Sequence, residues 1–261
     1  MASFNNPKRV VIKVGTSTLT YENGKMNIKR LAKLVSVIAD IVNSGIEVAL
    51  VSSGAIGVGV GKLGLKSRPT DTMGRQAAAA VGQCELMFIY DKLFSEYGHK
   101  IGQLLITKSD VANDERREHL TNTFDRLFEY GALPIVNEND SVSVDEIVFG
   151  DNDCLSAHVA KLVKADGLIM LTDIDGLYTA NPAEDENAEL INVVNEINDD
   201  IRSIAGGAVS NRGTGGMITK INAAEIATEA GISVIIMNGA TPTDIYKAIE
   251  GRHIGTFFCA K

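Results

Sequence analysis

The sequence predicts an α/β fold in which helices cover both faces of a mainly parallel open sheet, a three-layer αβα sandwich. Short runs of β-branched and apolar residues alternate along the chain with longer segments whose apolar residues recur every three to four positions. The first alternation is strand 10–14, helix 28–42 and strand 46–51, an order that makes the two strands parallel neighbours. Ligands of such sheets bind beyond the carboxyl ends of the strands, so a site is expected there.

The remaining elements follow from the same patterns and from residues that begin and end helices. Asn27 caps the first long helix and Gly45 follows its end, and a further helix opens after Ser52, Ser53 and Gly54. The other strands are predicted at 101–106, 133–136, 167–171 and 232–236, and the other helices at 73–97, 114–130, from the turn 150–153 to 163, and up to 230. A hairpin is expected at 142–148, a loop at 180–192, less regular structure up to 207, and a last helix and strand at the C-terminal end.

Composition excludes several classes of protein. With 261 residues, 45% of them hydrophobic and 22% charged, the chain can bury a full core. Its 25 basic and 33 acidic residues give a net charge of −8, which argues against nucleic acid or an anionic membrane as main partner. The apolar runs fall short of the ~20 residues that span a membrane, and no signal-peptide cleavage site is present, so a cytoplasmic location is expected. Three scattered cysteines suggest neither a disulfide framework nor a CxxC metal site.

The first strand contains an unusual charge. Lys13 lies inside the apolar run 10–14, which is typical of a strand buried on both faces, where an ammonium group is costly without anionic partners. Gly15 provides backbone freedom where the strand ends, and residues 16–18 provide hydroxyls and amides, as in a phosphate site. The alternative is an edge-strand lysine whose ammonium reaches water along its apolar stem. This segment alone leaves both interpretations open.

Polar residues gather where the other strands end. The cluster 137–140 (Asn-Glu-Asn-Asp) follows one strand, and 151–153 (Asp-Asn-Asp) precedes a helix. A helix cap or a turn explains one residue of each cluster but not the whole of it. Two acidic clusters and two lysines therefore suggest a site that handles both an ammonium group and several anions.

The segment 213–220, GTGGMITK, places three glycines before a helix whose first turn carries Lys220. Free amides and the dipole at a helix N-terminus attract phosphate, so phosphate binding is favoured over a routine helix start. The Walker A pattern fits neither this segment nor 57–63. Gly59, Gly61 and Gly64 spell GxGxxG, with Glu85 at the distance of a ribose-binding carboxylate, but that pattern should begin at the strand end, and we discount a dehydrogenase.

None of the four histidines (His99, His119, His158, His253) has a promising context, and Cys154 with His158 is better explained by packing than by a metal. An alcohol nucleophile would call for a general base. A carboxylate acceptor with a pKa near ~4.3 is already ionised at pH 7 and needs none. Its repulsion from the negatively charged phosphoryl group must be reduced, however, since two like unit charges ~4 Å apart cost roughly 4 kcal/mol at an effective dielectric of 20. Two lysines and Mg²⁺ reduce that repulsion in phosphoryl transfer.

Six segments, in this order and spacing, closely resemble the glutamate 5-kinase branch of the amino acid kinase family: RVVIKVGTSTL, VSSGAIGVG, PIVNENDSV, FGDNDCLSA, LTDIDGLYT and GTGGMITK. The resemblance extends over essentially the entire chain. It implies the amino acid kinase fold for a single domain 1–261, with an acceptor-substrate lobe over about 1–165 and a nucleotide lobe over about 166–261. It also implies ATP-dependent phosphorylation of the side-chain carboxylate of L-glutamate to L-glutamyl 5-phosphate, the first step of proline biosynthesis.

The resemblance assigns roles residue by residue. Lys13 is similar to the lysine that contacts the transferring phosphate, Lys220 to its partner from the nucleotide side, and Asp153 to the aspartate that holds both. The implied substrate-binding positions are Ser53, Gly54, Asn137, Asp140 and Asn152. The implied ATP-binding positions are Lys13, Gly15, Thr172, Asp173, Thr214, Gly215, Gly216, Met217, Ile218, Thr219 and Lys220. In this family Mg²⁺ is carried mainly by the nucleotide phosphates, so no protein ligand for it is implied.

The resemblance further implies a homo-oligomer, feedback inhibition by proline near the glutamate site, and coupling to glutamyl phosphate reductase. Many relatives carry a C-terminal PUA-type domain, and since the chain stops at Lys261 a form without it is expected. The close rival is N-acetylglutamate kinase, against which Asp140 argues because an acetylated nitrogen has no charge to pair. A nucleotide-binding or storage protein of the same fold is a second rival, against which the presence of Lys13, Lys220 and Asp153 argues.

Overall fold

One eight-stranded sheet forms the centre of the structure, a computed structural model that describes residues 4, 6–21, 25–142, 152–206 and 216–261. The strand order is β3-β4-β2-β1-β5-β7-β8-β6. Only the pairing of β7 with β8 is antiparallel among the described strand pairs. The strands are β1 (Arg9–Val14), β2 (Glu47–Ser52), β3 (Lys100–Ile106), β4 (Ala132–Glu138), β5 (Gly167–Thr172), β6 (Val193–Val194), β7 (Ser233–Asn238) and β8 (Thr256–Phe258).

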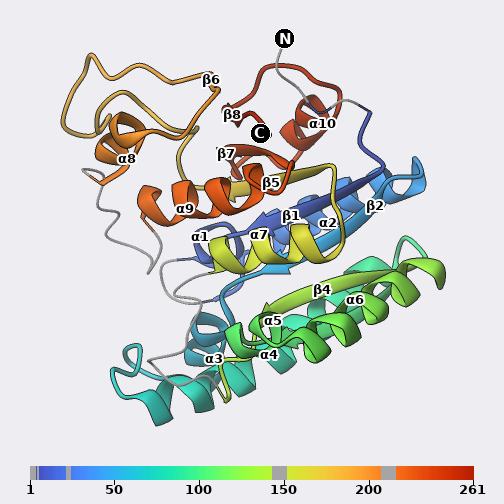
Figure 1. The fold of residues 1–261 in the computed structure, drawn as a ribbon. Coiled ribbons are helices and arrows are strands. Elements are labelled where there is room, and N and C mark those ends of the chain that lie inside the picture. Colours follow the sequence, from blue (N-terminus) through green and yellow to red (C-terminus); the bar gives the residue numbers. More distant parts are fainter. Residues whose placement is uncertain (1–3, 5, 22–24, 143–151, 207–215) are drawn as a thin grey trace.

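Helices cover the sheet on both faces (Figure 1), so the predicted three-layer αβα sandwich is confirmed. Helices α6, α7 and α9 lie on one face, and α2 and α4 lie on the other. The helices are α1 (Thr16–Leu19), α2 (Ile28–Asn43), α3 (Ala55–Leu63), α4 (Thr72–Ser95), α5 (Lys108–Ala112), α6 (Asp114–Glu129), α7 (Asn152–Leu162), α8 (Asp199–Gly206), α9 (Met217–Thr228) and α10 (Asp244–Ile249).

The alternation of side chains along β1 explains why this strand is apolar throughout. Val10, Ile12 and Val14 belong to the hydrophobic cluster under α2 and α4, while Val11 belongs to the cluster under α7 and α9. Burying one such side chain contributes ~1.5–3 kcal/mol. Lys13 has the same parity as Val11 and therefore points to the α7 face.

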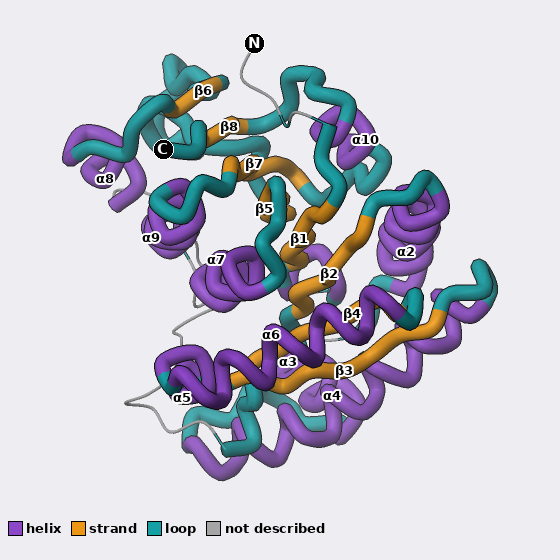
Figure 2. The backbone as a smooth tube through the Cα atoms, turned by 45° about the vertical axis from the view of Figure 1, so that its right-hand side comes forward, coloured by secondary structure: helices purple, strands orange, loops and turns teal. Residues whose placement is uncertain are grey.

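The chain adds strands to the sheet on both sides of β1, so the strand order reverses there. Strands β2, β4 and β3 lie on one side of β1, and β5, β7, β8 and β6 lie on the other, as Figure 2 shows. Such a switch point leaves a crevice outside the carboxyl ends of the two central strands, where ligands of open α/β sheets bind. The carboxyl ends of β1, β2, β4 and β5 meet at one edge of the sheet because these strands are parallel.

Three short helices were not predicted. Where we expected less regular structure, α8 forms because Asn198 accepts a hydrogen bond from the Ile201 amide (3.0 Å) and Ile201 and Ile204 pack on the core. The chain folds into α1 directly after Gly15 and into α5 after Thr107, whose hydroxyl forms a capping box with Asp110. The predicted loop 180–192 is confirmed. The predicted hairpin 142–148 lies, except for Val142, outside the described residues.

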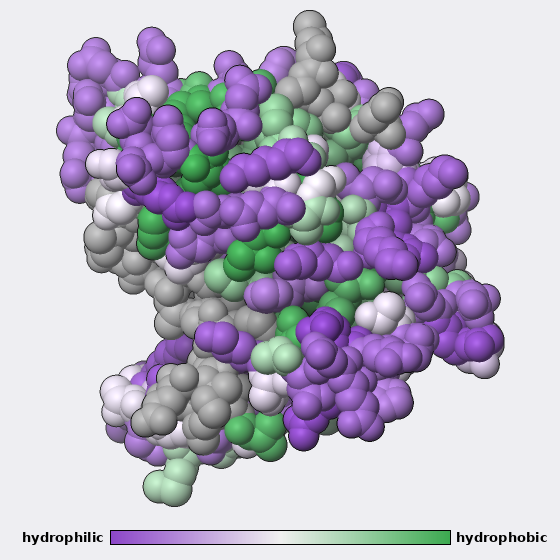
Figure 3. Space-filling model, viewed as in Figure 1, coloured by the Kyte–Doolittle hydropathy of each residue, from purple (hydrophilic) through white to green (hydrophobic). Residues whose placement is uncertain are grey.

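The visible surface over α6 and α9 is mostly hydrophilic, with smaller apolar patches between the hydrophilic stretches (Figure 3). Among the described residues, no helix combines the length and hydrophobicity that a membrane crossing requires.

Candidate active site

Lys13 lies in the middle of the sheet, where β1 pairs with β2 on one side and with β5 on the other. Its side chain is buried and the residue is only 6% exposed. The edge-strand alternative is therefore wrong, because a lysine in a central strand cannot reach water along the sheet edge. Its Nζ lies 2.5 Å from Oδ1 of Asp153 in α7, which provides the anionic partner that burial demands.

Asp153 joins this lysine to a second one. The carboxylate is 1% exposed in the first turn of α7, and Lys220 Nζ donates to its Oδ2 over 3.1 Å from the first turn of α9. Burial by itself raises the pKa of Asp153, but the ammonium groups of Lys13 and Lys220 outweigh it, so that the pKa lies below its ordinary value. Two lysines far apart in the sequence thus converge on one ionised carboxylate.

Lys13, Asp153 and Lys220 bring two positive charges to one negative charge. Lys220 is 6% exposed, like Lys13, so two buried cations share one buried anion. The Thr219 hydroxyl lies 2.9 Å from Asp153 Oδ2 and 2.8 Å from the Gly216 carbonyl oxygen, which ties the start of α9 to the same carboxylate. The triad of Lys13, Asp153 and Lys220 is therefore suited to receive a further anion.

A tight turn lies on the predicted acceptor side of the site. Ser52 ends β2, and Gly54 adopts φ +91° before α3 begins, a conformation that glycine reaches without strain. Asn152, the residue before Asp153, lies against this turn: its Nδ2 is 2.9 Å from Ser52 O and 3.0 Å from Ser53 Oγ. The structure therefore brings Ser53, Gly54 and Asn152 together next to the triad.

The end of β4 completes this side. Asn137 Oδ1 accepts from Asn152 Nδ2 (2.9 Å) and from the Glu138 amide (2.9 Å). Asp140 follows three residues later and is half-buried. Burial raises the pKa of Asp140, and the opposing charges of Arg68 and Arg75 do not fully compensate. A cation placed beside Asp140 would stabilise the ionised form of this carboxylate.

The predicted nucleotide side lies at the ends of β5 and at the start of α9. Thr172 is buried at the end of β5, and its hydroxyl donates to Asp173 Oδ1 over 3.1 Å. Gly216 precedes Met217, Ile218 and Thr219 at the start of α9, and no side chain of the described residues caps the first amides of this helix. Thr214 and Gly215 lie outside the described residues.

Gly15 does not need the backbone freedom that the sequence suggested, since its φ of −80° is open to any residue. A Cβ at this position would lie 3.6 Å from the Leu171 carbonyl oxygen and 3.8 Å from Lys13 Nζ. The position therefore lies beside the Lys13 ammonium and the end of β5, where a side chain would occupy space in front of the lysine.

Two residues of this region were missed by sequence reasoning. Gln83 and Tyr90 of α4 hydrogen-bond Asn137 and Ser52, respectively. Both share the helical spacing of Ala79 and Leu86, which places polar groups on the buried face of the helix. Polar residues at positions that the helical spacing assigns to the buried face were the available signal. The alanine-rich composition of the segment concealed that signal.

The GxGxxG pattern has a packing explanation. A Cβ on Gly59 would lie 1.8 Å from the Ala78 carbonyl oxygen, so this glycine permits close contact between α3 and α4. Gly64 ends α3 with φ +66°. The pattern lies within and after a helix rather than at a strand end, which agrees with its rejection as a dinucleotide site.

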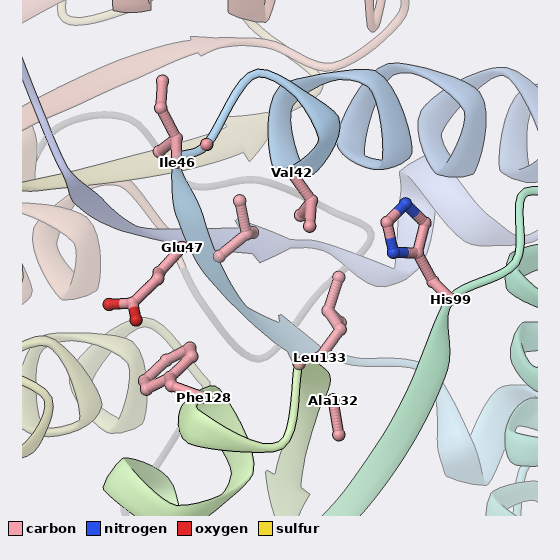
Figure 4. Close-up of a pocket in the computed structure, with 10 residues that line it drawn as sticks. Val42, Ile46, Glu47, His99, Phe128, Ala132 and Leu133 are labelled. Carbon is pink, nitrogen blue, oxygen red and sulfur yellow. The ribbon is translucent and has the colours of Figure 1, made fainter.

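A cavity of about 230 Å³ lies at the opposite edge of the sheet, at the amino ends of β2 and β4. Figure 4 shows Val42, His99 and Leu133 around it, with the Glu47 carboxylate turned away. Glu47 pairs with Arg9 at the start of β1. This position separates the cavity from the triad. Within the described ranges, no group of three or more histidine, cysteine or acidic residues could hold a metal ion.

Comparison with known proteins relates this geometry to a family. The model of the amino acid kinase family matches residues 8–238. The glutamate 5-kinase of Clostridium perfringens is 53% identical over 263 aligned residues, which cover 99% of this chain and 98% of the relative, and that of Clostridium acetobutylicum is 55% identical over 257, covering 98% and 96%. The UMP kinase of Bacillus anthracis superimposes with a TM-score of 0.67 at 17% identity, covering 98% of each chain, and supports the fold.

Proposed function

The chain belongs to the amino acid kinase family, and from this premise we propose that it transfers the γ-phosphoryl group of ATP to the side-chain carboxylate of free L-glutamate. The product is L-glutamyl 5-phosphate, and the reaction is the first step of proline biosynthesis. The observation that carries the proposal is the convergence of Lys13 and Lys220 on Asp153.

The triad suits the electrostatics of this reaction. An ionised carboxylate must approach a phosphoryl group that is also negative, and at ~4 Å a pair of unit charges repels by roughly 4 kcal/mol at an effective dielectric of 20. We propose that Lys13 and Lys220 contact the transferring phosphoryl group and that Asp153 holds both ammonium groups in position. No general base is required, since the acceptor is already ionised at neutral pH.

The acceptor side suits free glutamate. Asp140 would pair with the substrate α-ammonium, which would stabilise the ionised form of a carboxylate whose pKa burial has raised. Donors of the turn at Ser53 and Gly54, with the amides of Asn137 and Asn152, would orient the substrate. An acetylated amine offers no positive charge to Asp140, so N-acetylglutamate should be the poorer acceptor.

The nucleotide would lie beside the end of β5 and the start of α9. Thr172 and Asp173 would contact it from the strand, and residues 214–220 together with Gly15 would surround its phosphates. Mg²⁺, when bound, neutralises phosphate charge. The described residues hold no cluster of metal ligands and Asp153 is already paired with two lysines, so the ion would be held mainly through the nucleotide.

We also propose the properties that accompany this activity in the family: a cytoplasmic enzyme, a homo-oligomer, inhibition by proline near the glutamate side, and delivery of a labile acyl phosphate to a reductase. The division into an acceptor-substrate lobe over about 1–165 and a nucleotide lobe over about 166–261 belongs to the same proposal; its support is the change of strand order at β1.

Trapping of the acyl phosphate with hydroxylamine tests the function. The protein with ATP, Mg²⁺ and L-glutamate should form γ-glutamyl hydroxamate, and N-acetylglutamate should give far less. Preference for N-acetylglutamate would contradict the acceptor assignment, and a folded protein that forms no hydroxamate from either substrate would favour a binding or storage role.

A lysine variant tests, in the same assay, whether the convergence of Lys13 and Lys220 on Asp153 serves catalysis. Lys13→Met should lower kcat by about 10²–10³, as in sites where one donor to a developing anion is removed. Folding should survive, because Asp153 keeps Lys220 as its partner. Lys8→Met is the matched control, an exposed lysine just before the start of the same strand. A Lys13→Met enzyme with kcat within threefold of wild type would refute the role.

A further inference from the structure

Helix α4 sends two polar side chains to the acceptor side of the site. Gln83 Oε1 accepts a hydrogen bond from Asn137 Nδ2 over 2.8 Å, and the Tyr90 hydroxyl lies 2.9 Å from Ser52 Oγ. The two residues are two helical turns apart, so both contacts arise from one face of the helix. Together they attach the ends of β4 and β2 to the same rigid element.

The hydrogen bonds of Asn137 have a defined direction. The backbone amide of Glu138 can only donate, and it lies 2.9 Å from Asn137 Oδ1, so the oxygen of that side chain must face it. The amino group of Asn137 must then face Gln83, whose Oε1 is an acceptor. Asn137 is almost fully buried, and Gln83 therefore provides the acceptor that its amino group requires.

The side-chain amide of Asn152 also has a defined orientation. The oxygen of Asn137 faces Asn152 and the Ser52 carbonyl can only accept, so Asn152 must present its amino group to both: Asn152 Nδ2 lies 2.9 Å from Asn137 Oδ1, 2.9 Å from Ser52 O and 3.0 Å from Ser53 Oγ. The two hydrogens of this group are thus shared by three acceptors of the protein. The oxygen of Asn152 remains as the polar atom of its side chain that is turned away from this network.

We propose that Gln83 is a positioning residue for the acceptor substrate. Through Asn137 it helps to hold the Asn152 amide, which the Ser52 carbonyl also orients, with its amino group on the Ser53 turn. The inference rests on the proposed function, since it concerns how the same site recognises glutamate. Gln83 touches neither the triad nor the predicted nucleotide side in any contact that the described residues show, so its effect should be confined to the acceptor.

Loss of the Gln83 acceptor would leave a buried donor on Asn137. A rotation of the Asn137 amide by 180° does not restore the network, since its amino group would then face two donors, the Glu138 amide and Asn152 Nδ2. Asn137 would either keep its orientation with an unpaired buried amino group or shift and release Asn152 Nδ2, so the fraction of molecules with a competent acceptor pocket would fall. Apparent affinity decreases in proportion to that fraction.

Two substitutions at one position separate positioning from packing. Gln83→Met keeps the length and flexibility of the side chain but removes the acceptor, and it should raise KM for glutamate by about tenfold, the usual order for one unsatisfied buried donor. KM for ATP should stay within about twofold, because the nucleotide side is not part of the network. Gln83→Glu keeps a carboxyl oxygen for Asn137 Nδ2, and its KM for glutamate should stay within about threefold of wild type.

Gln103→Met is the matched control, since Gln103 is exposed on the edge strand β3. It should change neither KM. An unchanged KM for glutamate in Gln83→Met, or equal impairment of the Met and Glu variants, would overturn the proposal. Equal changes in the KM for glutamate and for ATP would also overturn it, because they would indicate a general loss of structure. A wild-type protein that forms no γ-glutamyl hydroxamate would overturn the proposed function and this inference together, whereas an active wild type with an unaffected Gln83→Met variant would overturn the inference alone.

Discussion

Asp153 is the carboxylate that both buried lysines of the triad contact. If it is removed, Lys13 and Lys220 lose this shared negative charge in a region that water hardly reaches. Breaking a buried ion pair by removal of one partner usually costs more than the pair itself contributes, because the remaining charge is left uncompensated. The residue is therefore expected to support stability as well as turnover.

We predict that Asp153→Asn lowers the free energy of unfolding by about 3–5 kcal/mol at pH 7. Since the pKa of Asp153 is lower in the folded than in the unfolded chain, its stabilising effect is present above the unfolded pKa of ~3.9 and is lost as the pH falls through the folded pKa. The difference between wild type and variant should therefore hold from pH 7 to 5 and shrink in more acidic solution. Urea titrations across this range measure it.

Asp200→Asn provides the control for that experiment. Asp200 is exposed in the first turn of α8, where removal of a carboxylate should cost no more than about 1 kcal/mol. If Asp153→Asn proved as stable as this control, the triad would not be the buried charge cluster that the structure shows.

Asp140 should act on glutamate binding instead. Burial raises the pKa of Asp140, so the carboxylate takes up a proton at a higher pH than an ordinary aspartate does. In the proposed role the ionised form binds the substrate ammonium, so KM for glutamate should rise as the pH falls, beginning above the usual aspartate range. Asp140→Asn should have a raised KM that varies less with pH. Steady-state kinetics at several pH values would test this, and a variant with the wild-type profile would exclude Asp140 from substrate binding.

Helices α3 and α4 determine where the acceptor side lies. α3 begins directly after the Ser53–Gly54 turn, and α4 carries Gln83 and Tyr90. The two helices approach so closely that a Cβ on Gly82 would lie 1.8 Å from the Ala55 carbonyl oxygen. Since backbone atoms cannot move aside as a flexible side chain can, glycines are required at this crossing.

We predict that Gly59→Ala destabilises the protein by about 1–3 kcal/mol, because its Cβ would overlap the backbone of Ala78. Gly57→Ala is the matched control on the same helix, where the nearest atom would be Thr16 Cγ2 at 3.7 Å. There the higher helix propensity of alanine should leave stability unchanged or raise it by up to ~1 kcal/mol. Denaturant titration of both variants measures the difference; similar values for the two would contradict the close crossing.

Among the described residues, the large apolar side chains that are exposed include two on α4. Met73 is 78% exposed and Phe88 is 64% exposed, although the helix buries its other side on the sheet. An interface over this helix would remove both side chains from water. They support the proposed homo-oligomer, in which a second copy of the chain would cover this side of α4.

We predict that the wild-type protein contains more than one chain in solution and that Phe88→Glu shifts it toward the monomer, because a buried unpaired carboxylate is costly at an apolar interface. Light scattering during size-exclusion chromatography measures the mass. Tyr130→Glu is the control, since Tyr130 is 70% exposed at the end of α6, on the other face of the sheet. A monomeric wild type, or an oligomer that Phe88→Glu leaves intact, would refute the assignment of this surface.

The sequence was sufficient to predict the alternation of strands and helices, the parallel sheet, and the residues at the strand ends that form the candidate site. These features follow from local periodicity and from residue types whose chemistry is unusual for their position, such as Lys13 in an apolar strand. The short helix α8 was missed because eight residues carry too little periodic signal before packing is added.

Only the tertiary structure decided which groups meet. A lysine in β1 and a lysine in α9 share Asp153 because the strand order turns at β1, and that order depends on packing between distant segments. The contacts of Gln83 with Asn137 and of Tyr90 with Ser52 arise in the same way, from the crossing of α4 behind the sheet. Hydrogen bonds and ion pairs act over about 3–4 Å, whereas sequence patterns report only on neighbours along the chain, so the partners of a buried polar group become known only when the chain is folded.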